Sequence, residues 1–402
     1  MKKITLGVGV IGSGFMGKIH AWAFGSVGRI FALQQKPVLS MMADISAAAA
    51  ARAANQLSFE RSTGDWRELV HSPDVDIVSI ATPNIYHAPM ALEAIKAGKY
   101  VYCEKPMATT LRDALEMTRL AEEEGVITIV GFNYLRNPMI RLARDIIESG
   151  EIGEPTGYRG VHSEGFMADK NQPYTWRCEK KNAGGATSEI GSHVLATARY
   201  LLGDIDEVCG QMDTIYHTRP AADGSQREVN IDDQMNCLVK FKKYGFTGTL
   251  TASWLATGRA MHHGFELSGS KGSMVFDQSR FNELQLYKAD QRGGRKGFTR
   301  IELGPEHGDY GAFCLASGHQ LGFNDLKILE VKKLLDCIAT GRQTDLSFRD
   351  ALQVTRVSEA IARSSEEGCW VEMTEIEDLP SLQRRKPKIS SGNIKAVLEK
   401  PV

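Results

Sequence analysis

The first third of the chain alternates short apolar runs with amphipathic or Ala-rich stretches. The apolar runs hold Val and Ile in continuous rather than alternating series, which is typical of parallel strands buried on both faces. We therefore predict strands at Ile4 to Ile11, Val38 to Ala43, Ile77 to Ala81, Tyr100 to Cys103 and Ile127 to Gly131. Helices are expected from near Phe15 and over Ala47 to Ala54, His87 to Ala97 and Leu111 to Glu124. This order predicts a doubly wound parallel sheet, the Rossmann type of α/β domain.

The pattern changes after a predicted helix over Ile140 to Ser149. Strand candidates then follow one another closely, at Thr156 to Ser163, Cys209 to Tyr216, Met235 to Phe241, Phe246 to Trp254 and Gly264 to Leu267. Turn residues separate them, which favours antiparallel pairing. Further helices are expected at Ser192 to Leu202, Leu326 to Ala339 and Asp350 to Ser364. This part is therefore predicted to be an α+β domain built on a large, mainly antiparallel sheet.

Length favours two domains, because 402 residues exceed the usual size of one hydrophobic core. We place the domains at 1–133 and 134–379 and leave a polar segment at 380–402. This last segment is interpreted as a tail or as an arm laid on a neighbouring subunit. A basic interaction motif is the alternative, because Arg384, Arg385, Lys386 and Lys388 lie close together.

Charge and cysteine usage narrow the classes of partner. The 48 Lys and Arg residues almost cancel the 49 Asp and Glu residues, so no net charge draws the chain to nucleic acid. No apolar run approaches the ~20 residues that a membrane span needs. The seven cysteines lack the close spacing of a metal site or a redox pair. We expect reduced thiols, a cytoplasmic location, and neither nucleic acid nor membrane as a partner.

A glycine-rich turn follows the first predicted strand. Gly12-Ser13-Gly14-Phe15-Met16-Gly17 matches the pattern G-x-G-x-x-G at the start of a helix. Gly12 permits the tight turn, Gly14 lets the backbone approach a pyrophosphate, and Gly17 lets the helix pack closely on the strand. The N–H groups at the helix N-terminus attract the phosphates. The segment, with Phe15 and Met16, is predicted to bind a dinucleotide.

Asp44 follows the end of the second predicted strand. A carboxylate at this position accepts hydrogen bonds from the hydroxyls of the adenosine ribose and repels a 2′-phosphate, which favours NAD over NADP. Asp44 lies farther from Gly17 than the usual ~20 residues. We interpret Gly28 to Lys36 as an insertion before the strand. A solvated Asp in a helix-capping turn is the alternative.

Two further motifs stand at the carboxyl ends of predicted strands, the edge at which ligands bind in such a sheet. Thr82-Pro83-Asn84-Ile85-Tyr86-His87 follows Ala81, and Glu104-Lys105-Pro106 follows Cys103. A partly desolvated Lys105 beside a nicotinamide can donate to a substrate hydroxyl and stabilise the developing carbonyl oxygen. A solvated charge at a strand end is the alternative.

The second domain supplies a candidate acid/base pair within Gly184-Gly185-Ala186-Thr187-Ser188-Glu189-Ile190-Gly191-Ser192-His193. The carboxylate and the imidazole stand four residues apart, which places them on one face of a helix. His193 can accept the proton of an alcohol near neutral pH, and Glu189 can orient it or bind an adjacent hydroxyl. Such a pair is elsewhere more often surface or core, but the preceding glycines favour a functional role because they allow close backbone approach.

Together these motifs resemble the glucose-fructose oxidoreductase, inositol dehydrogenase and MocA (Gfo/Idh/MocA) family. The likeness also includes Gly131-Phe132-Asn133-Tyr134 and Gly150-Glu151-Ile152-Gly153, and it runs from Val8 to about Met373. It implies that Lys105 is the catalytic lysine, that His193 is the acid/base, and that NAD is the cofactor. It also implies a C-terminal sheet that forms an oligomer interface, and hence a homodimer or homotetramer.

The resemblance extends the candidate site. It implies cofactor contacts at Thr82, Pro83, Asn84, His87, Glu104, Lys105, Asn133, Trp176 and Arg177, and substrate contacts at Lys105, Tyr134, Arg136, Glu189 and His193. Trp176 is expected to stack on a sugar face or on the nicotinamide, and Arg177 to donate to a hydroxyl or a carboxamide; loop packing is the alternative for both. His162, His263 and His319 are interpreted as structural or solvated, and no residue pattern indicates a metal.

Glu189 departs from the family, which usually has Asp at this position. The longer side chain reaches a different hydroxyl or orients His193 less tightly, so inositol oxidation is a weaker expectation. Pro173-Tyr174-Thr175-Trp176-Arg177 and the insertion before Asp44 resemble the levoglucosan and glycoside 3-dehydrogenase branch, which oxidises the C3 hydroxyl of a pyranose.

We therefore expect NAD-dependent oxidation of a secondary hydroxyl in a sugar, anhydro-sugar or glycoside. A cyclic polyol (inositol) dehydrogenase is one alternative. Another is a redox-neutral glycosidase or lyase that keeps NAD bound and acts through a 3-keto intermediate. A non-catalytic NAD sensor is disfavoured because Lys105 and His193 are both present.

Overall fold

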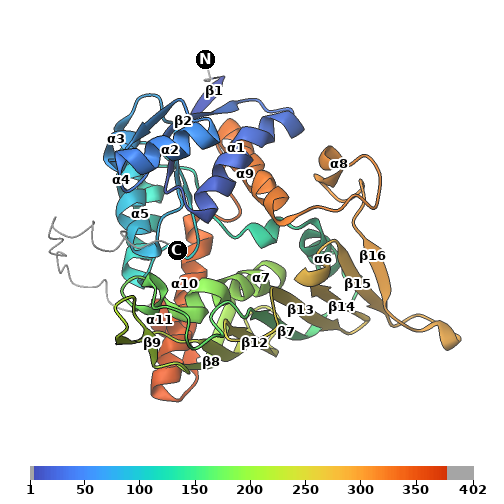
Figure 1. The fold of residues 1–402 in the computed structure, drawn as a ribbon. Helices are drawn as coiled ribbons and strands as arrows, with labels where there is room; N and C mark the ends of the chain where they lie inside the picture. Colours follow the sequence, from blue (N-terminus) through green and yellow to red (C-terminus); the bar gives the residue numbers. More distant parts are fainter. Residues whose placement is uncertain (1–3, 378–402) are drawn as a thin grey trace. The chain divides into compact units, whose positions relative to one another are not determined.

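The computed structural model describes residues 4–377, which form two compact units (Figure 1). The first unit contains residues 4–131 and a returning segment, Val331–Leu352, and the second contains Phe132–Glu330 and Gln353–Ile376. This arrangement differs from the predicted division, in which the second domain runs unbroken from 134 to 379. The predicted tail at 380–402 lies outside the described residues.

A six-stranded parallel sheet forms the centre of the first unit. Its strands, in the order β3-β2-β1-β4-β5-β6, are β1 (Thr5–Ile11), β2 (Lys36–Ala43), β3 (Arg61–Thr63), β4 (Ile77–Ile80), β5 (Tyr100–Cys103) and β6 (Thr128–Val130). The strand order reverses between β1 and β4, and the crevice beside their carboxyl ends is where such sheets bind ligands. The predicted Rossmann fold is confirmed. The sequence does not predict β3, because this strand is short and polar.

The helices of the first unit connect these strands. They are α1 (Phe15–Ile30), α2 (Ala47–Leu57), α3 (Trp66–His71), the short 3₁₀ turn η1 (Asn84–Tyr86), α4 (His87–Lys96) and α5 (Leu111–Glu123). Ser46 and Thr110 cap α2 and α5 by accepting hydrogen bonds from backbone N–H groups in the first turn, at 3.2 and 3.1 Å. These caps explain why both helices begin where the sequence predicts.

The returning segment is hydrogen-bonded to β6 at the edge of the sheet. The Val130 N–H donates to the carbonyl of Leu346 at 2.8 Å, and the Thr344 hydroxyl donates to the carbonyl of Thr128 at 2.7 Å. The Thr128 hydroxyl in turn accepts from the Phe348 N–H at 3.1 Å. The edge of the Rossmann sheet is therefore completed by residues from far along the chain.

The second unit is built on a nine-stranded sheet in the order β16-β15-β14-β13-β7-β12-β11-β8-β17. Its strands are β7 (Pro155–Ser163), β8 (Ile205–Asp213), β11 (Gln234–Phe241), β12 (Thr247–Ser253), β13 (His262–Gly269), β14 (Gly272–Asp277), β15 (Glu283–Lys288), β16 (Thr299–Glu302) and β17 (Val371–Glu372). All pairings are antiparallel except that of β7 with β12. The predicted mainly antiparallel sheet is confirmed.

Helix α7 packs on β7 and β12 of this sheet and also contacts α6. The remaining α-helices within residues 4–377 are α6 (Pro138–Glu148), α7 (Ser192–Leu202), α8 (Tyr310–Phe313), α9 (Phe323–Thr340), α10 (Phe348–Glu367) and α11 (Met373–Glu377). A separate hairpin pairs β9 (Thr218–Pro220) with β10 (Gln226–Glu228). Helices α9 and α10 each contain a boundary between the two units.

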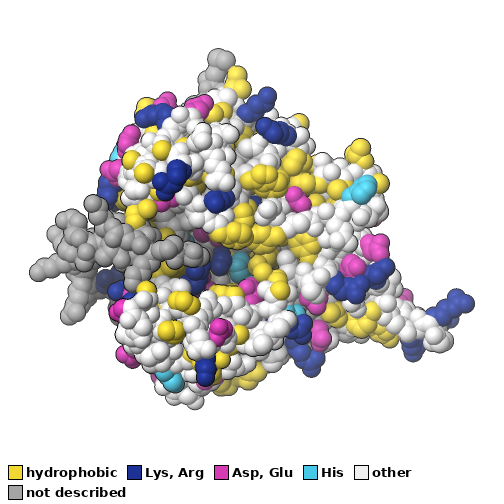
Figure 2. All heavy atoms as spheres, in the orientation of Figure 1, with side chains coloured by type: hydrophobic (Ala, Val, Ile, Leu, Met, Phe, Trp, Pro, Cys, Tyr) yellow, Lys and Arg dark blue, Asp and Glu magenta, His cyan; other side chains and the backbone are white. Residues whose placement is uncertain are grey.

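Surface composition agrees with the near-neutral charge. Figure 2 shows Lys and Arg side chains interspersed with Asp and Glu over the visible face. Within residues 4–377, no helix combines the length and the apolar character that crossing a bilayer requires.

Candidate functional site

The glycine-rich turn has the backbone that a dinucleotide requires. Gly12 has φ +96°, a left-handed conformation that favours glycine, and a Cβ on Gly17 would lie 1.8 Å from the carbonyl oxygen of Gly12. A Cβ on Gly14 would meet no atom within 4 Å, so the backbone there faces open space. Gly14 is also the N-cap of α1 and supplies no side-chain cap. The turn therefore fits a pyrophosphate at the helix N-terminus.

Asp44 is held against this turn. Its Oδ2 accepts hydrogen bonds from the Ser13 N–H at 2.9 Å and from the Ser13 hydroxyl, and its Oδ1 accepts from the Ile45 N–H at 2.6 Å. The long spacing from Gly17 arises because α1 continues to Ile30 and β2 begins at Lys36. Thus residues 28–30 lengthen the helix, and only a short connection precedes the strand. The side chain lies where a ribose-reading carboxylate is predicted, and that role stays a prediction.

Glu104 is buried directly after β5, with both carboxylate oxygens engaged. Oε1 lies 2.8 Å from Nε2 of His20, and Oε2 accepts the backbone N–H of Lys105 at 3.2 Å. His20 is fully buried on α1, and no sequence motif indicates a role for it. The contact of Glu104 with the cofactor stays a prediction, and these two interactions show that the carboxylate holds the backbone beside Lys105.

His87 joins the two strand-end motifs. Its Nδ1 lies 2.8 Å from the carbonyl oxygen of Pro106, and its Nε2 lies 2.9 Å from that of Thr82. The ring is fully buried at the start of α4. His87 therefore ties the turn after β4 to the turn that carries Lys105. Its predicted contact with the cofactor, like those of Pro83 and Asn84, remains a prediction.

Glu189 and His193 belong to two different kinds of helix. Thr187–Gly191 forms a π-helical turn (η4), and the α-helical geometry of α7 begins at Ser192. A π-helix closes its hydrogen bonds one residue later than an α-helix, so Glu189 and His193 do not lie on one continuous α-helix, and their placement on one helical face stays a prediction. Isolated π-helical turns are rare and occur frequently at functional sites.

Asp232 anchors this π-helical turn and was not predicted. Its Oδ2 accepts from the backbone N–H of Thr187 at 2.8 Å and from the Thr187 hydroxyl at 2.7 Å, and its carbonyl accepts from the Ala186 N–H at 2.9 Å. Gly185 is required here, because its φ is +71° and a Cβ would lie 1.8 Å from Oδ1 of Asp232. Burial raises the pKa of Asp232 to about 6, although the Thr187 hydrogen bonds oppose this shift.

The predicted residues Trp176 and Arg177 pack on each other. They lie in the 3₁₀ turn η3 (Trp176–Cys178), and the Arg177 guanidinium stands 4.3 Å above the Trp176 ring. Nε of Arg177 also lies 3.9 Å from Oε2 of Glu189, whose side chain is buried. Arg177 therefore links the loop that carries Trp176 to the candidate carboxylate. The stacking role of Trp176 and the donor role of Arg177 stay predictions.

His193 lies in a group of aromatic rings centred on Tyr134. The centre of the Tyr134 ring is 4.5 Å from that of His193, 5.2 Å from that of His263 and 5.9 Å from that of His162. All four rings are buried, so His162 and His263 are not solvated. Burial, followed by the charges of His162 and His262, lowers the pKa of His263 well below its usual value.

Asn133 and Arg136 share the 3₁₀ turn η2 (Asn133–Arg136) with Tyr134.

His162 lies at the end of β7, with its Nε2 2.8 Å from Oε1 of Glu164. Because these two residues are two apart along an extended segment, their side chains share a face, and this spacing is a signal that the sequence carries for the pair.

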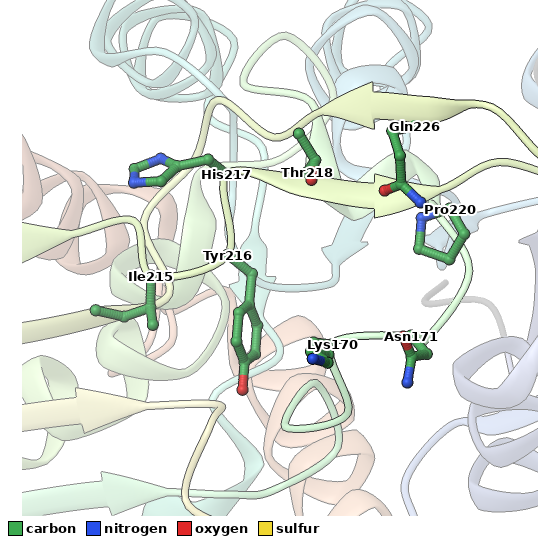
Figure 3. A pocket seen from close by; sticks show the side chains of 8 residues that line it. All are labelled: Lys170, Asn171, Ile215, Tyr216, His217, Thr218, Pro220 and Gln226. Carbon is green, nitrogen blue, oxygen red and sulfur yellow. The ribbon is translucent and has the colours of Figure 1, made fainter.

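A cavity of about 380 Å³ lies beside the β9–β10 hairpin (Figure 3). Its lining residues are Lys170, Asn171, Ile215, Tyr216, His217, Thr218, Pro220 and Gln226. No predicted site residue lines it. Next to it, the buried Arg219 donates to the carbonyls of Met167 and Asp169 at 2.7 and 2.8 Å, which holds the loop before Trp176.

The structure thus brings the predicted residues together within each unit. Gly12, Asp44 and Lys105 follow strands β1, β2 and β5 of one sheet, while Glu189 lies in η4 and His193 in the first turn of α7, which follows η4 directly. The convergence of Lys105 and His193 stays a prediction, since the two residues belong to different units. Among residues 4–377, no three His, Cys, Asp or Glu side chains are grouped so that they could hold a metal ion.

Comparison with known proteins identifies the family. Residues 6–132 match the family model for an oxidoreductase family with an NAD-binding Rossmann fold, and residues 140–275 match that for the GFO/IDH/MocA C-terminal domain. Levoglucosan dehydrogenase from Pseudarthrobacter phenanthrenivorans is 35% identical over 387 residues, which cover 92% of this chain and 99% of that protein. The scyllo-inositol 2-dehydrogenase (NAD(+)) of Bacillus subtilis is 26% identical and covers 81% of this chain, with 85% of its own length matched.

The fold comparison agrees with the sequence comparison. A solved structure of levoglucosan dehydrogenase in complex with NADH and L-sorbose superposes with a TM-score of 0.89 at 36% identity. The match covers 92% of this chain and 99% of that one. The chain therefore belongs to the Gfo/Idh/MocA family of oxidoreductases, and its cofactor is NAD.

Proposed function

We propose that this enzyme oxidises a secondary hydroxyl, at C3 of a pyranose sugar, anhydro-sugar or glycoside, to the ketone. The names of its relatives, which act on levoglucosan and scyllo-inositol, support a CH–OH group of a sugar or polyol as the reacting group. The choice of C3 rests on the likeness of residues 173–177 to the 3-dehydrogenase branch. NAD⁺, when bound, accepts the hydride that leaves the carbinol carbon.

The buried His193 carries this proposal. Its side chain stands at the first turn of α7, 4.5 Å from the Tyr134 ring and 6.0 Å from the Phe132 ring, measured between ring centres. These contacts restrict the orientation of the imidazole, which a general base needs. In its neutral form, His193 takes the hydroxyl proton of the substrate as the hydride departs.

Lys105 and Glu189 complete the proposed reaction. The ammonium group of Lys105 donates a hydrogen bond to the substrate oxygen and stabilises the negative charge that develops there. Glu189 accepts a hydrogen bond from a neighbouring substrate hydroxyl and thereby orients the ring. The family usually has the shorter Asp at position 189. Arg177, whose Nε lies 3.9 Å from Oε2 of Glu189, holds the longer side chain in position.

The test is the pair of variants Lys105→Ala and His193→Ala. Each is expected to abolish turnover while NAD binding, measured by calorimetric titration, is retained. Lys96→Ala and His217→Ala are matched controls, because these side chains are exposed and are expected to leave turnover unchanged. Full turnover in either active-site variant would refute the assigned roles.

The substrate is tested with a panel of pyranoses, inositols, anhydro-sugars and glycosides, supplied with NAD⁺ or NADP⁺. Absorbance of the reduced cofactor and product mass are recorded together. A dehydrogenase accumulates NADH and a product two hydrogens lighter. Cleavage of a glycoside without net NADH supports the redox-neutral alternative instead, and turnover confined to inositols supports the polyol dehydrogenase.

A further inference from the structure

Glu104 occupies an unusual position for a charged side chain. It immediately precedes Lys105 and is only 5% exposed. Its Oε2 accepts the Lys105 N–H at 3.2 Å, so the carboxylate folds back onto the peptide that carries the candidate catalytic lysine. A buried carboxylate needs partners for its remaining lone pairs, and the nearest one comes from another element.

That partner is His20, which lies in α1 three residues after Gly17, the last glycine of the glycine-rich turn. Its Nε2 lies 2.8 Å from Oε1 of Glu104, and its Nδ1 lies 2.7 Å from the hydroxyl oxygen of Ser79 on β4. The imidazole also stacks on the Tyr102 ring of β5, with the ring centres 4.2 Å apart and the planes inclined by 14°. Residues of β4, of β5 and of the turn after β5 therefore fix the plane of this ring.

The proton positions follow from the chemistry of the partners. An ionised carboxylate only accepts hydrogen bonds, so Nε2 of His20 carries a hydrogen and donates it to Glu104. In the neutral ring Nδ1 is then an acceptor, and the Ser79 hydroxyl donates to it. A chain of hydrogen bonds runs from Ser79 through His20 and Glu104 to the backbone of Lys105.

Gly131, which directly follows β6, leaves space for the side chain of Glu104. A Cβ on Gly131 would lie 2.6 Å from Oε1 of Glu104, closer than two such atoms approach. The Gly131 N–H also donates to the carbonyl of Cys103 at 2.9 Å, which holds the two strand ends together. Glycine at position 131 therefore leaves space for the carboxylate to reach His20.

We propose that His20 is a positioning residue, which acts through Glu104 to fix the backbone and the charge beside Lys105. The inference rests on the proposed function, because it takes Lys105 as the group that stabilises the substrate oxygen. Its consequence is a coupling between α1, which begins at the cofactor-binding turn, and the strand end that presents the lysine.

The experiment compares His20→Asn, Glu104→Gln and the double variant. Each single variant is expected to lower kcat by about tenfold or more, with the dissociation constant for NAD unchanged within about twofold. The double variant is expected to be no slower than the slower single variant, because both changes break one chain of interactions. His71→Asn is the matched control, since His71 forms a similar pair with Glu93 on the exposed surface and is expected to retain wild-type kcat.

A kcat for His20→Asn equal to that of the wild type, or losses that multiply in the double variant, would overturn the proposal. A second measurement uses the unaltered protein, so it does not depend on the folding of a variant. Nitrogen-15 NMR of labelled histidine is expected to show His20 as the neutral tautomer with hydrogen on Nε2; a hydrogen on Nδ1 alone would contradict the chain of hydrogen bonds. Retained turnover in Lys105→Ala indicates failure of the proposed function, whereas an inactive Lys105→Ala beside a fully active His20→Asn indicates failure of this inference alone.

Discussion

Replacing Asp232 by Asn is expected to flatten the pH dependence of the stability of the second unit. Asp232 is buried, and its side chain accepts two hydrogen bonds from Thr187 at the start of the π-helical turn. Asn has nearly the same shape and keeps an acceptor oxygen for Thr187, but it carries no charge. The substitution therefore isolates the cost of burying this carboxylate.

The magnitude follows from the pKa of Asp232, which burial raises from 3.8 to about 6. Since the folded state binds this proton more tightly than the unfolded chain, the group contributes stability that is fully present below about pH 4. That contribution is lost as pH rises through about 6. The shift of about two pH units corresponds to a loss of about 3 kcal/mol in the free energy of unfolding.

Urea unfolding at several pH values between about 4 and 8 measures this slope in the wild type and in Asp232→Asn. The wild-type free energy of unfolding is expected to fall relative to that of the variant as pH rises across this range. Asp223→Asn, in an exposed turn, is the control and is expected to leave the slope unchanged. Parallel pH profiles for the wild type and Asp232→Asn would show that burial of this carboxylate does not set the stability of the turn.

Three further outcomes are expected. Gly17→Ala should weaken NAD binding by about a hundredfold or more in calorimetric titration, because its Cβ would lie 1.8 Å from the backbone oxygen of Gly12; wild-type affinity would contradict the close packing. Asp44→Ala should lower the ratio of kcat/KM for NAD⁺ over NADP⁺ by about tenfold or more, and an unchanged ratio would remove Asp44 from cofactor selection. Arg219→Met should cost about 2 to 4 kcal/mol and expose the loop at 165–178 to limited proteolysis, because two buried carbonyls lose their donor; equal digestion of both proteins would argue against this anchoring role.

The sequence predicts the first unit well because its strands are continuous apolar runs and because the caps Ser46 and Thr110 mark the starts of α2 and α5. Strand β5 and helix α7 have the predicted bounds, Tyr100–Cys103 and Ser192–Leu202. Strands β14 to β16 are missed at the sheet edge, although β14 alternates buried and partly exposed positions as a strand should. The π-helical turn at Thr187–Gly191 carries no periodic signal, because five residues are too few to distinguish it from an α-helix.

Some residues of the candidate site can be predicted from the sequence, and others are revealed only by the fold. Gly12, Gly17, Asp44 and Lys105 are readable because each follows a predicted strand at a fixed offset. His20 is not readable in this way, because its partner Glu104 lies 84 residues farther along the chain and only the fold brings the two together. The same is true of Thr187 and Asp232, which are 45 residues apart.

The hydrogen bonds between β6 and the segment Val331–Leu352 have a consequence for biosynthesis. During translation, the Rossmann sheet cannot reach its final edge when residue 131 leaves the ribosome, because Leu346 has not yet been made. An isolated fragment that stops near residue 133 would expose the backbone groups of Thr128 and Val130 to pairing with other chains. The nucleotide-binding half thus matures only after residues 132–330 of the other unit have been synthesised.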